Sequence, residues 1–464
     1  MDIIDILGNG FVHILEIIFV EMVNYRTFLK VQQIPRYETL LLPVWKKWWQ
    51  RKIARSPVWR MLSSRAKHYD VSLMDKLNHR DVHYYRDQCL CIEDRFKAIR
   101  NSLKNGFHHQ TKETTLDFSE PPIISPFHIP LRSSIKDFVV NYQNIFVVLN
   151  RGPVSRIIML NRWTLTETKR LDIDSFIPKL KVNSLFAIFP IKDPFNNSLY
   201  VYDVNTLELI QIINAPSDDR NIFCDSTLYC FCLTESFLYY AGLTYDMSNV
   251  TVTINVLKLN HASNHFEMIE KRSFEYESCS PAFDAEIYVD DKHLILDCND
   301  FCNFETVRRI QVRCVKTMDL IHYGCFSTST NIKKEYKQGK ILVETKINQK
   351  DCVAVWDARK NTCEYVIKHP ISDNFRYILS TSMTHFTNYQ ILIKKGNQCK
   401  VQLVRKNKCL GRCLKSNVIY SFDEKKLDGC TYIPHLTRYI LYCDGAQLIV
   451  ASNRRPYLMI VDLI

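Results

Sequence analysis

Residues 353–357 read Val-Ala-Val-Trp-Asp, an apolar run that ends at a Trp–Asp pair and is followed by a polar turn. The same pattern, a short apolar run closed by a polar or charged residue, recurs along the C-terminal three quarters of the chain. The closing residues are Asn161, Asp203, Lys258, Arg313, Asp357, Arg405 and Asp462, at intervals of 42, 55, 55, 44, 48 and 57 residues. A second apolar run usually follows the turn, as at residues 365–367. This part of the chain is therefore a series of β-rich repeats.

Repeats of this length suit the four-stranded blades of a β-propeller. Seven run ends predict seven blades, and only Trp356-Asp357 keeps the WD dipeptide. Because the last run ends two residues before the end of the sequence, we expect a strand from residues 123–140 to complete the last sheet and leave no open edge. With 11 glycines in 464 residues, the turns must be built from Asn, Asp and Lys. A β-sandwich pair or an irregular all-β domain is the alternative.

The first 112 residues have a helical pattern instead. Apolar residues recur at three- and four-residue spacing over 11–23 and over 85–103, and Gly106 follows as a helix stop. Between these stretches, Ser56 and Pro57 suit the N-cap and first position of another helix. Four of the six tryptophans lie within fifteen residues, at Trp45, Trp48, Trp49 and Trp59. Such a concentration indicates either a compact small core or an anchor surface for a partner.

Two gapless stretches of this region resemble F-box/WD-repeat proteins of the β-transducin-repeat-containing type. Residues 45–60, with Trp-Lys-Lys at their start and Val-Trp-Arg at their end, are similar to the end of that family's F-box. Residues 84–106, with Tyr-Tyr-Arg at 84–86, look like the family's helix that links the F-box to the propeller. Upstream, residues 10–29 are similar to the first F-box helices.

The sequence also departs from that family. Residues 8–10, Gly-Asn-Gly, stand where Leu-Pro opens the F-box. Residues 34–37, Ile-Pro-Arg-Tyr, replace a Val-Cys-Lys-x-Trp segment, and about two residues are missing before Trp45. With these departures, we expect the fold of the module to be intact and its adaptor binding to be weaker. An unrelated helical bundle with tryptophans in its core is the alternative.

The predicted fold class is an α plus all-β multidomain chain, with a helical module ahead of a seven-bladed WD-like β-propeller. A Pro-rich stretch separates the helical pattern from the β-rich one. The expected domains are an F-box-type module at 1–69, a helical linker at 70–112, a Pro-rich joint at 113–132 and the propeller at 133–464.

The net charge of +12 is concentrated near the N-terminus, where residues 45–112 hold 16 Lys and Arg against 6 Asp and Glu. Because no aromatic-basic stacking motif accompanies this excess, we expect a solvated helix face and no nucleic-acid partner. Acidic residues interrupt the apolar N-terminus and no basic n-region precedes it, so we expect neither a signal peptide nor a membrane span. The 17 cysteines show no disulfide framework or paired zinc knuckles, which favours a cytoplasmic or nuclear protein without bound metal.

Signatures of catalysis are missing from the sequence. It contains no G-x-S-x-G, no H-E-x-x-H and no P-loop. His79 and His83 lie four residues apart, as metal ligands on one helix face do, but such a pair is more often exposed and unliganded. We therefore expect a non-enzymatic protein without a cofactor. A propeller enzyme is the alternative, because its catalytic residues would be scattered over the blades without a local motif.

The resemblance implies the substrate-receptor subunit of an SCF-type cullin–RING ubiquitin ligase. Its helices would bind a Skp-type adaptor and, through it, cullin, while the propeller would bind a target protein. Residues expected at the adaptor surface, each of which could instead belong to the core of the module, are Ile14, Leu15, Ile18, Phe28, Leu29, Trp45 and Trp48.

Relatives in that family read phosphorylated peptides with propeller arginines, which suggests arginines as the target-binding residues here. The candidates, all expected in loops, are Arg151, Arg156, Arg220, Arg359 and Arg454. No blade aligns with those of the relatives, so the identity of the target and any dependence on phosphate stay open.

The relatives carry a dimerising segment ahead of the F-box, whereas here the helical pattern begins almost at Met1. We therefore expect a monomer within the complex. The rival interpretation is a propeller interaction scaffold with a helical docking arm and no connection to ubiquitin. The departures from the F-box pattern favour the scaffold, and the two gapless stretches favour the ligase subunit.

Overall fold

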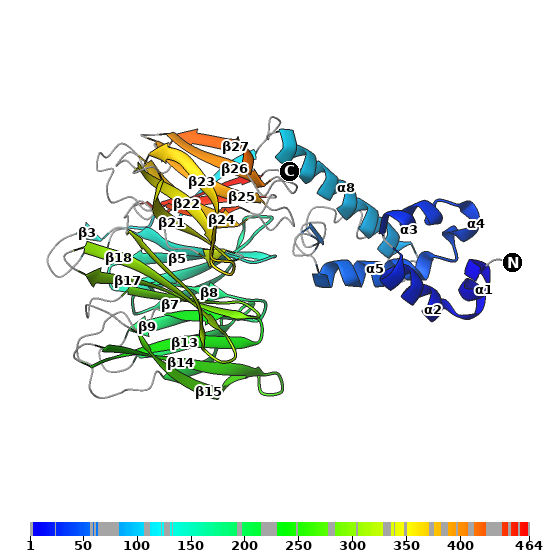
Figure 1. The fold of residues 1–464 in the computed structure, drawn as a ribbon. Coiled ribbons are helices and arrows are strands. Elements are labelled where there is room, and N and C mark those ends of the chain that lie inside the picture. Colours follow the sequence, from blue (N-terminus) through cyan, green and yellow to red (C-terminus); the bar gives the residue numbers. More distant parts are fainter. Residues whose placement is uncertain are drawn as a thin grey trace.

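The computed structural model consists of a helical module that projects from a β-propeller (Figure 1). Helix α8 (Tyr84–Asn105) runs from the helical module to the propeller. The structure describes residues 3–23, 25–55, 59, 62–63, 83–105, 112–121, 123–124, 130–131, 133–192, 197–214, 230–246, 249–276, 284–302, 305–327, 336–337, 339–347, 350–370, 375–381, 388–395, 398–406, 413–423, 439–443, 447–452 and 455–462.

Short helices pack around a longer one in the helical module. Its elements before α8 are α1 (Ile3–Gly10), α2 (Val12–Ile17), the π-helix η1 (Ile18–Met22), α3 (Tyr25–Gln32), α4 (Pro35–Glu38) and α5 (Leu42–Arg55). Pro35 occupies the first position of α4, where its missing N–H costs nothing. Trp45 and Trp48 lie three residues apart in α5, which places both rings on the same side of that helix.

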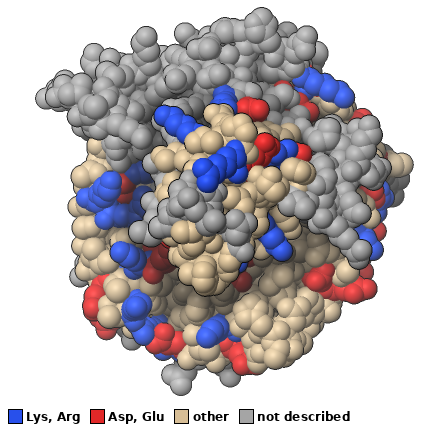
Figure 2. Space-filling view, turned by 90° about the vertical axis from the view of Figure 1, so that its right-hand side faces the viewer, with Lys and Arg blue, Asp and Glu red and all other residues tan. Residues whose placement is uncertain are grey.

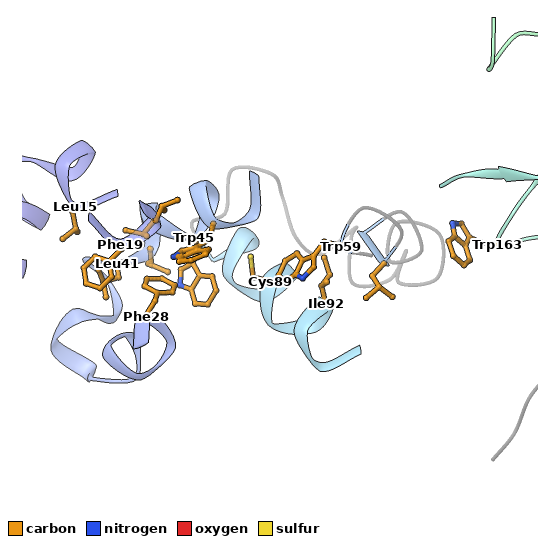
Figure 3. Close-up of a cluster of buried hydrophobic side chains, with 14 of the residues drawn as sticks. Leu15, Phe19, Phe28, Leu41, Trp45, Trp59, Cys89, Ile92 and Trp163 are labelled. Atoms are coloured by element: carbon orange, nitrogen blue, oxygen red, sulfur yellow. The ribbon is translucent and has the colours of Figure 1, made fainter. Parts of the chain in front are cut away.

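The concentrated tryptophans form the core of this module (Figure 3). The rings of Phe28 and Trp45 meet edge to face, with their centroids 4.8 Å apart, and both side chains are fully buried. From α8, Cys89 and Ile92 complete the cluster, and the side chain of Trp59 is buried in it as well. Of the two uses predicted for these tryptophans, the structure therefore supports a small core.

Antiparallel four-stranded sheets make up most of the propeller. The strands of the first three are β4 (Ser134–Val140), β5 (Asn144–Arg151), β6 (Val154–Asn161) and β7 (Glu167–Ile173); β8 (Lys181–Val182), β9 (Phe186–Lys192), β10 (Asn197–Asp203) and β11 (Leu209–Asn214); β12 (Phe231–Leu233), β13 (Phe237–Asp246), β14 (Asn249–Asn260) and β15 (His265–Tyr276). The first strands of neighbouring sheets lie next to each other, as expected around the centre of a propeller.

The remaining strands form one eight-stranded sheet, two four-stranded sheets and a short two-stranded ribbon. They are β16 (Asp284–Val289), β17 (His293–Cys302), β18 (Glu305–Cys314), β19 (Leu320–Ser327), β20 (Tyr336–Lys337), β21 (Lys340–Ile347), β22 (Lys350–Asp357) and β23 (Thr362–Pro370) in one sheet; β24 (Phe375–Thr381), β25 (Asn388–Lys395), β26 (Gln398–Lys406) and β27 (Cys413–Asp423); β28 (Tyr439–Cys443), β29 (Gln447–Ser452), β30 (Tyr457–Asp462) and β1 (Lys112–Asp117); and the ribbon of β2 (Ile123–Ile124) and β3 (Pro130–Leu131).

The described residues thus form six large sheets, whereas seven separate blades were predicted. The difference lies in the eight-stranded sheet, where β19 and β21 are joined at the pair Ser327–Glu344 and connect two four-stranded halves. The buried guanidinium of Arg308 also links the halves. It donates to both carboxylate oxygens of Asp297, at 2.9 and 2.6 Å, and across to the carbonyl oxygen of Leu342 at 2.6 Å.

The predicted run ends coincide with the ends of third strands. Each lies at or within two residues of the last residue of β6, β10, β14, β18, β22, β26 or β30. Asn161 ends β6, and its Oδ1 accepts hydrogen bonds from the backbone N–H groups of Trp163 and Thr164, at 2.9 and 3.1 Å. Asp203 caps the equivalent turn after β10 in the same way. Asn and Asp therefore supply the turn geometry that glycine often provides.

The ring is closed by a different segment from the one predicted. Strand β1 pairs antiparallel with β30, from Lys112–Asp462 to Asp117–Tyr457, and becomes the fourth strand of the last sheet. The expected range, 123–140, instead contains β2 and the first strand of the first blade, β4. The physical reason is that β1, which begins seven residues after the end of α8 at Asn105, pairs with the open edge of the last sheet before the chain enters the first blade. We call the sheet of β28, β29, β30 and β1 the closing blade.

The topology gives the propeller two distinct faces. Because neighbouring strands in each blade are antiparallel, the last residues of its first and third strands lie on one face, and those of its second and fourth strands lie on the opposite face. Arg162 and Trp163, in the turn between β6 and β7, belong to the face nearest the helices, and Figure 3 shows Trp163 on the side of the propeller towards Trp59. Trp163 and Trp59 belong to one buried cluster, which also includes Leu448 of the closing blade. We call the face nearest the helices the arm-side face and the opposite one the far face.

Arg162 fixes this junction from within the propeller. Its side chain is fully buried, its Nε donates to Oε1 of Gln447 at 2.8 Å, and its guanidinium stacks on the ring of Trp163 at 4.5 Å. Because Gln447 belongs to the closing blade, Arg162 joins the first and last sheets directly beneath the helical module.

Candidate functional site

The end of the helical module farthest from the propeller exposes apolar side chains. Four of them lie on α1, α2 and the residue between these helices, and we call them the helical tip: Ile6, Phe11, Ile14 and Ile17, which are 49, 50, 38 and 58% exposed. Phe11, Ile14 and Ile17 recur every three residues, whereas the buried Leu15 and Phe19 lie four apart on the other side of the same helical segment. The segment is therefore apolar on two sides, and only one of them faces the core.

Most residues predicted for the adaptor surface lie inside the module. Leu15, Phe28, Trp45 and Trp48 are buried in its core. Ile18 and Leu29 are half-buried, and Leu29 packs against that core. Ile14 alone among the seven is exposed.

The sequence analysis missed Ile6, Phe11 and Ile17 as a surface. A signal was present, because residues 11–23 carry more apolar side chains than one helix face holds.

Ion pairs brace the tip against α5 without covering it. Lys47 Nζ lies 3.9 Å from Glu16 Oε2, and Arg51 Nη1 lies 3.3 Å from Glu21 Oε2. These pairs are at the surface and contribute little stability. Figure 2 views the molecule from the side of the helical module and shows Lys, Arg, Asp and Glu interspersed with broad uncharged areas. Apolar contact is thus the main chemistry that the tip offers to a partner.

Two of the predicted arginines, Arg151 and Arg156, meet on the far face of the first blade. Both guanidinium groups donate to the carboxylate of Glu120, which follows β1 in the chain. Arg156 also binds Asp172, with Nη2 and Oδ2 3.2 Å apart. This hydrogen bond is the main cause that lowers the pKa of the Asp172 carboxyl.

The other predicted arginines do not join this pair. Arg359 lies in the turn after β22, on the arm-side face, with its Nε 3.7 Å from Oδ1 of the buried Asp357. Arg220 and Arg454 lie outside the described residues. Of the five predicted arginines, the structure therefore brings together Arg151 and Arg156, which lie in strands β5 and β6 and not in loops as expected. Arg170 of β7 lies 4.0 Å from the same Glu120.

A second group of charges surrounds the centre of the propeller. Lys179, in the connection before β8, places its Nζ 3.1 Å from Oε2 of Glu286 on β16. Burial alone would raise the pKa of the Glu286 carboxyl, but Lys179, Lys181 and a hydrogen bond from the Tyr288 hydroxyl lower it to about 2. Because Lys179 and Glu286 come from the second and fourth blades in chain order, their pairing is an inter-blade contact.

The described residues contain no group of three or more His, Cys, Asp or Glu side chains that could hold a metal ion. His83 is exposed at the start of α8, and His79 lies outside the described residues. The free thiols include those of Cys89, Cys91, Cys230, Cys232, Cys298, Cys314, Cys325 and Cys363. In the part of the chain that the structure describes, no helix is both long and apolar enough to cross a bilayer.

Comparison with known proteins gives structural neighbours only. No family model matches the sequence, and no curated protein matches it. Among solved structures, a chain of the mitotic checkpoint complex is similar at 12% identity, with 75% of this chain and 92% of that chain covered and a TM-score of 0.40. The WD40 domain of SCAP from fission yeast is similar at 10% identity, with 76% and 98% covered and a TM-score of 0.41. The Dos1 propeller is similar at 11% identity, with 74% and 82% covered and a TM-score of 0.41.

Proposed function

We propose that this chain is the target-binding subunit of an SCF-type cullin–RING ubiquitin ligase, with no catalytic role of its own. The helical tip docks on a Skp-type adaptor, and the propeller holds a protein target. The observation that carries this proposal is the exposed apolar tip of Ile6, Phe11, Ile14 and Ile17, on helices that resemble an F-box in sequence.

The chemistry of the tip supports docking on a helical partner. Four large apolar side chains, each at least 38% exposed, lie on two short helices and on the residue that joins them. Covering such a surface removes it from water at about 25 cal/mol per Å². Its apolar character matches the helix-on-helix packing by which amphipathic partners bind. The core of Phe28, Trp45 and Trp48 behind the tip gives it a fixed shape.

The two-part architecture supports a tethering role. The helical tip lies at one end of the molecule and the far face of the propeller at the other (Figure 1). A target bound to the propeller would be held at a defined distance from whatever binds the tip. Tethering of this kind raises the effective concentration of target lysines near a ubiquitin-charged enzyme, without any chemistry by the receptor.

Co-elution of the full chain with a recombinant Skp-type adaptor in size-exclusion chromatography tests the proposal. The informative variant is Ile14→Glu/Ile17→Glu, because both side chains are exposed and the substitutions spare the core. The matched control is Leu209→Glu/Ile212→Glu on β11, where two apolar side chains are 48 and 46% exposed on the propeller. A Leu15→Glu variant is unsuitable, because Leu15 is buried and its substitution would test folding.

We expect the wild-type chain and the control variant each to form a one-to-one complex with the adaptor. The tip variant should elute separately from the adaptor. The affinity of the tip variant for the adaptor should be more than 100-fold lower, because each substitution places a charge in a contact that the complex would bury. Failure of the wild-type chain to bind, or binding by the folded tip variant, would contradict the proposal.

A second candidate is a protein-interaction scaffold unconnected to ubiquitin. The propeller fold is typical of such scaffolds, and the missing Leu-Pro opening at residues 8–10 favours this reading. In that case the folded chain would not bind the adaptor, and the tip would bind another helical partner. The co-elution experiment therefore separates the two candidates.

A further inference from the structure

The far face of the first blade holds an arginine site that is filled by the chain's own carboxylate. Arg151 at the end of β5 and Arg156 near the start of β6 both bind Glu120, and Arg170 of β7 lies 4.0 Å from it. The three arginines come from three adjacent strands, so the sheet fixes their spacing. Glu120 comes from elsewhere, in the segment between the closing blade and the first blade.

Polar contacts hold Glu120 in place. Its neighbours Ser119 and Pro121 are exposed, and the apolar anchor of the segment is Phe118, two residues earlier. Beyond the carboxylate contacts, the carbonyl oxygen of Pro121 accepts a hydrogen bond from Arg151. The carboxylate of another molecule can therefore replace that of Glu120 without opening the core, because the new contacts are of the same kind as those that are lost.

Without Glu120, two of the three arginines would still have a carboxylate partner. Arg170 keeps a bidentate pair with Glu167, at 2.9 Å for both bonds, and Arg156 keeps Asp172. Arg151 forms no second ion pair among the described contacts, although its charge helps to lower the pKa of the Asp172 carboxyl, and its buried Nε has no hydrogen-bond partner there. The site would therefore present a guanidinium group with unused donors, beside a second arginine.

We propose that Glu120 is an internal occupant of a carboxylate-binding site, and that an acidic peptide segment of a target protein displaces it to bind Arg151 and Arg156. This rests on the target-receptor half of the proposed function and adds a regulation to it: the site is closed until an acidic segment outcompetes Glu120. The location agrees with this role, because a ligand on the far face does not meet the helical module on the arm-side face.

Fluorescence anisotropy of the full chain with a labelled hexaglutamate peptide tests this inference, and a hexaglutamine peptide serves as the uncharged control. The variants are Glu120→Gln, which removes the internal carboxylate, and Glu120→Gln/Arg151→Gln, which also removes the arginine that loses its partner. Glu208→Gln is the matched control, because Glu208 is an exposed carboxylate on the second blade. The adaptor is absent, so the result does not depend on whether the helical tip binds it.

We expect Glu120→Gln to bind hexaglutamate at least ten-fold more tightly than the wild-type chain and Glu208→Gln. The double variant should lose that gain, and hexaglutamine should bind to none of them. Equal affinity of Glu120→Gln and the wild-type chain, or a gain that survives in the double variant, would overturn the inference. Should Glu120→Gln not fold, weak binding by the wild-type chain must disappear in Arg151→Gln, and its persistence would also overturn it.

Discussion

The two ends of the molecule present opposite chemistry to a partner. The helical tip exposes Ile6, Phe11, Ile14 and Ile17, and ion pairs lie beside them without covering them. On the far face of the first blade, the charges of Arg151 and Arg156 are already matched by carboxylates. The apolar side chains of the helical tip are therefore exposed to solvent, whereas the two arginines already form ion pairs within the chain.

This difference predicts two kinds of binding. A partner of the tip gains free energy by burying apolar area, which depends little on salt. A partner of the arginine site must replace existing ion pairs, so its affinity should fall as salt screens the charges. Four substitutions test this difference, and their expected effects on stability decrease in the order given below.

Trp45→Ala should have the largest effect on stability. The ring of Trp45 is fully buried against Phe28, and its removal leaves a cavity in the small core of the module. We expect a loss of about 3–5 kcal/mol in the free energy of unfolding of the helical module, measured by chemical denaturation of the full chain. A loss below about 1 kcal/mol would mean that the tip has no fixed core behind it.

The central pair of Lys179 and Glu286 should make the propeller sensitive to acid. The pKa of Glu286 falls from 4.5 to about 2 in the folded chain, so the folded state binds fewer protons than the unfolded chain within that range. The resulting stabilisation is complete above pH 4.5 and is lost as the pH falls towards 2, and it amounts to about 3 kcal/mol.

Thermal unfolding of the wild-type chain and of Glu286→Gln between pH 2.5 and 7 measures this contribution. The wild-type chain should be more stable at neutral pH, because the variant leaves Lys179 without its partner carboxylate. The difference should shrink as the pH falls below 4.5. A difference that is independent of pH would contradict the inter-blade pairing of these charges.

Glu120→Gln should lower stability by about 1 kcal/mol at low salt, because Arg151 and Arg156 lose a shared carboxylate at a partly exposed site. The loss should become smaller in 1 M NaCl, where exposed charges are screened. Unfolding by urea at the two salt concentrations measures it. An equal loss at both concentrations would show that Glu120 acts through packing.

Ile14→Glu/Ile17→Glu should have the smallest effect on stability, within about 0.5 kcal/mol, because both side chains already face water. Urea unfolding of this variant and of Trp45→Ala, both as full chains, compares the two losses in the free energy of unfolding. A loss of several kcal/mol would mean that the tip belongs to the core, and its reading as a docking surface would fail.

The strand repeat could be predicted because its signals are local. An apolar run that ends at Asn161 or Asp203 contains both the strand and the side chain that caps the following turn. Two blades are joined into one sheet at the pair Ser327–Glu344, and Arg308 donates across this junction to the carbonyl of Leu342, 34 residues away in sequence. Ring closure pairs β1 with β30, so that Lys112 lies opposite Asp462, and no local pattern encodes a pairing between segments so far apart in sequence.

The candidate sites were harder to predict for a related reason. The apolar stripe near the N-terminus indicated a helix, but its periodicity could not decide which side would face the core. Leu15 is buried and Ile14 beside it is exposed, because α5 packs against only one side of this segment. Likewise, the sequence marked Arg151 and Arg156 but not Glu120, since their partner comes from a segment that the fold brings to them.

Hydrogen–deuterium exchange of the full chain, with and without a Skp-type adaptor, shows where the adaptor binds. We expect slower exchange in α1, α2 and η1, over residues 3–22, with no change in the outer strands β11 and β15 of the propeller. Protection that is absent from residues 3–22, or that falls on the propeller blades instead, would contradict this expectation.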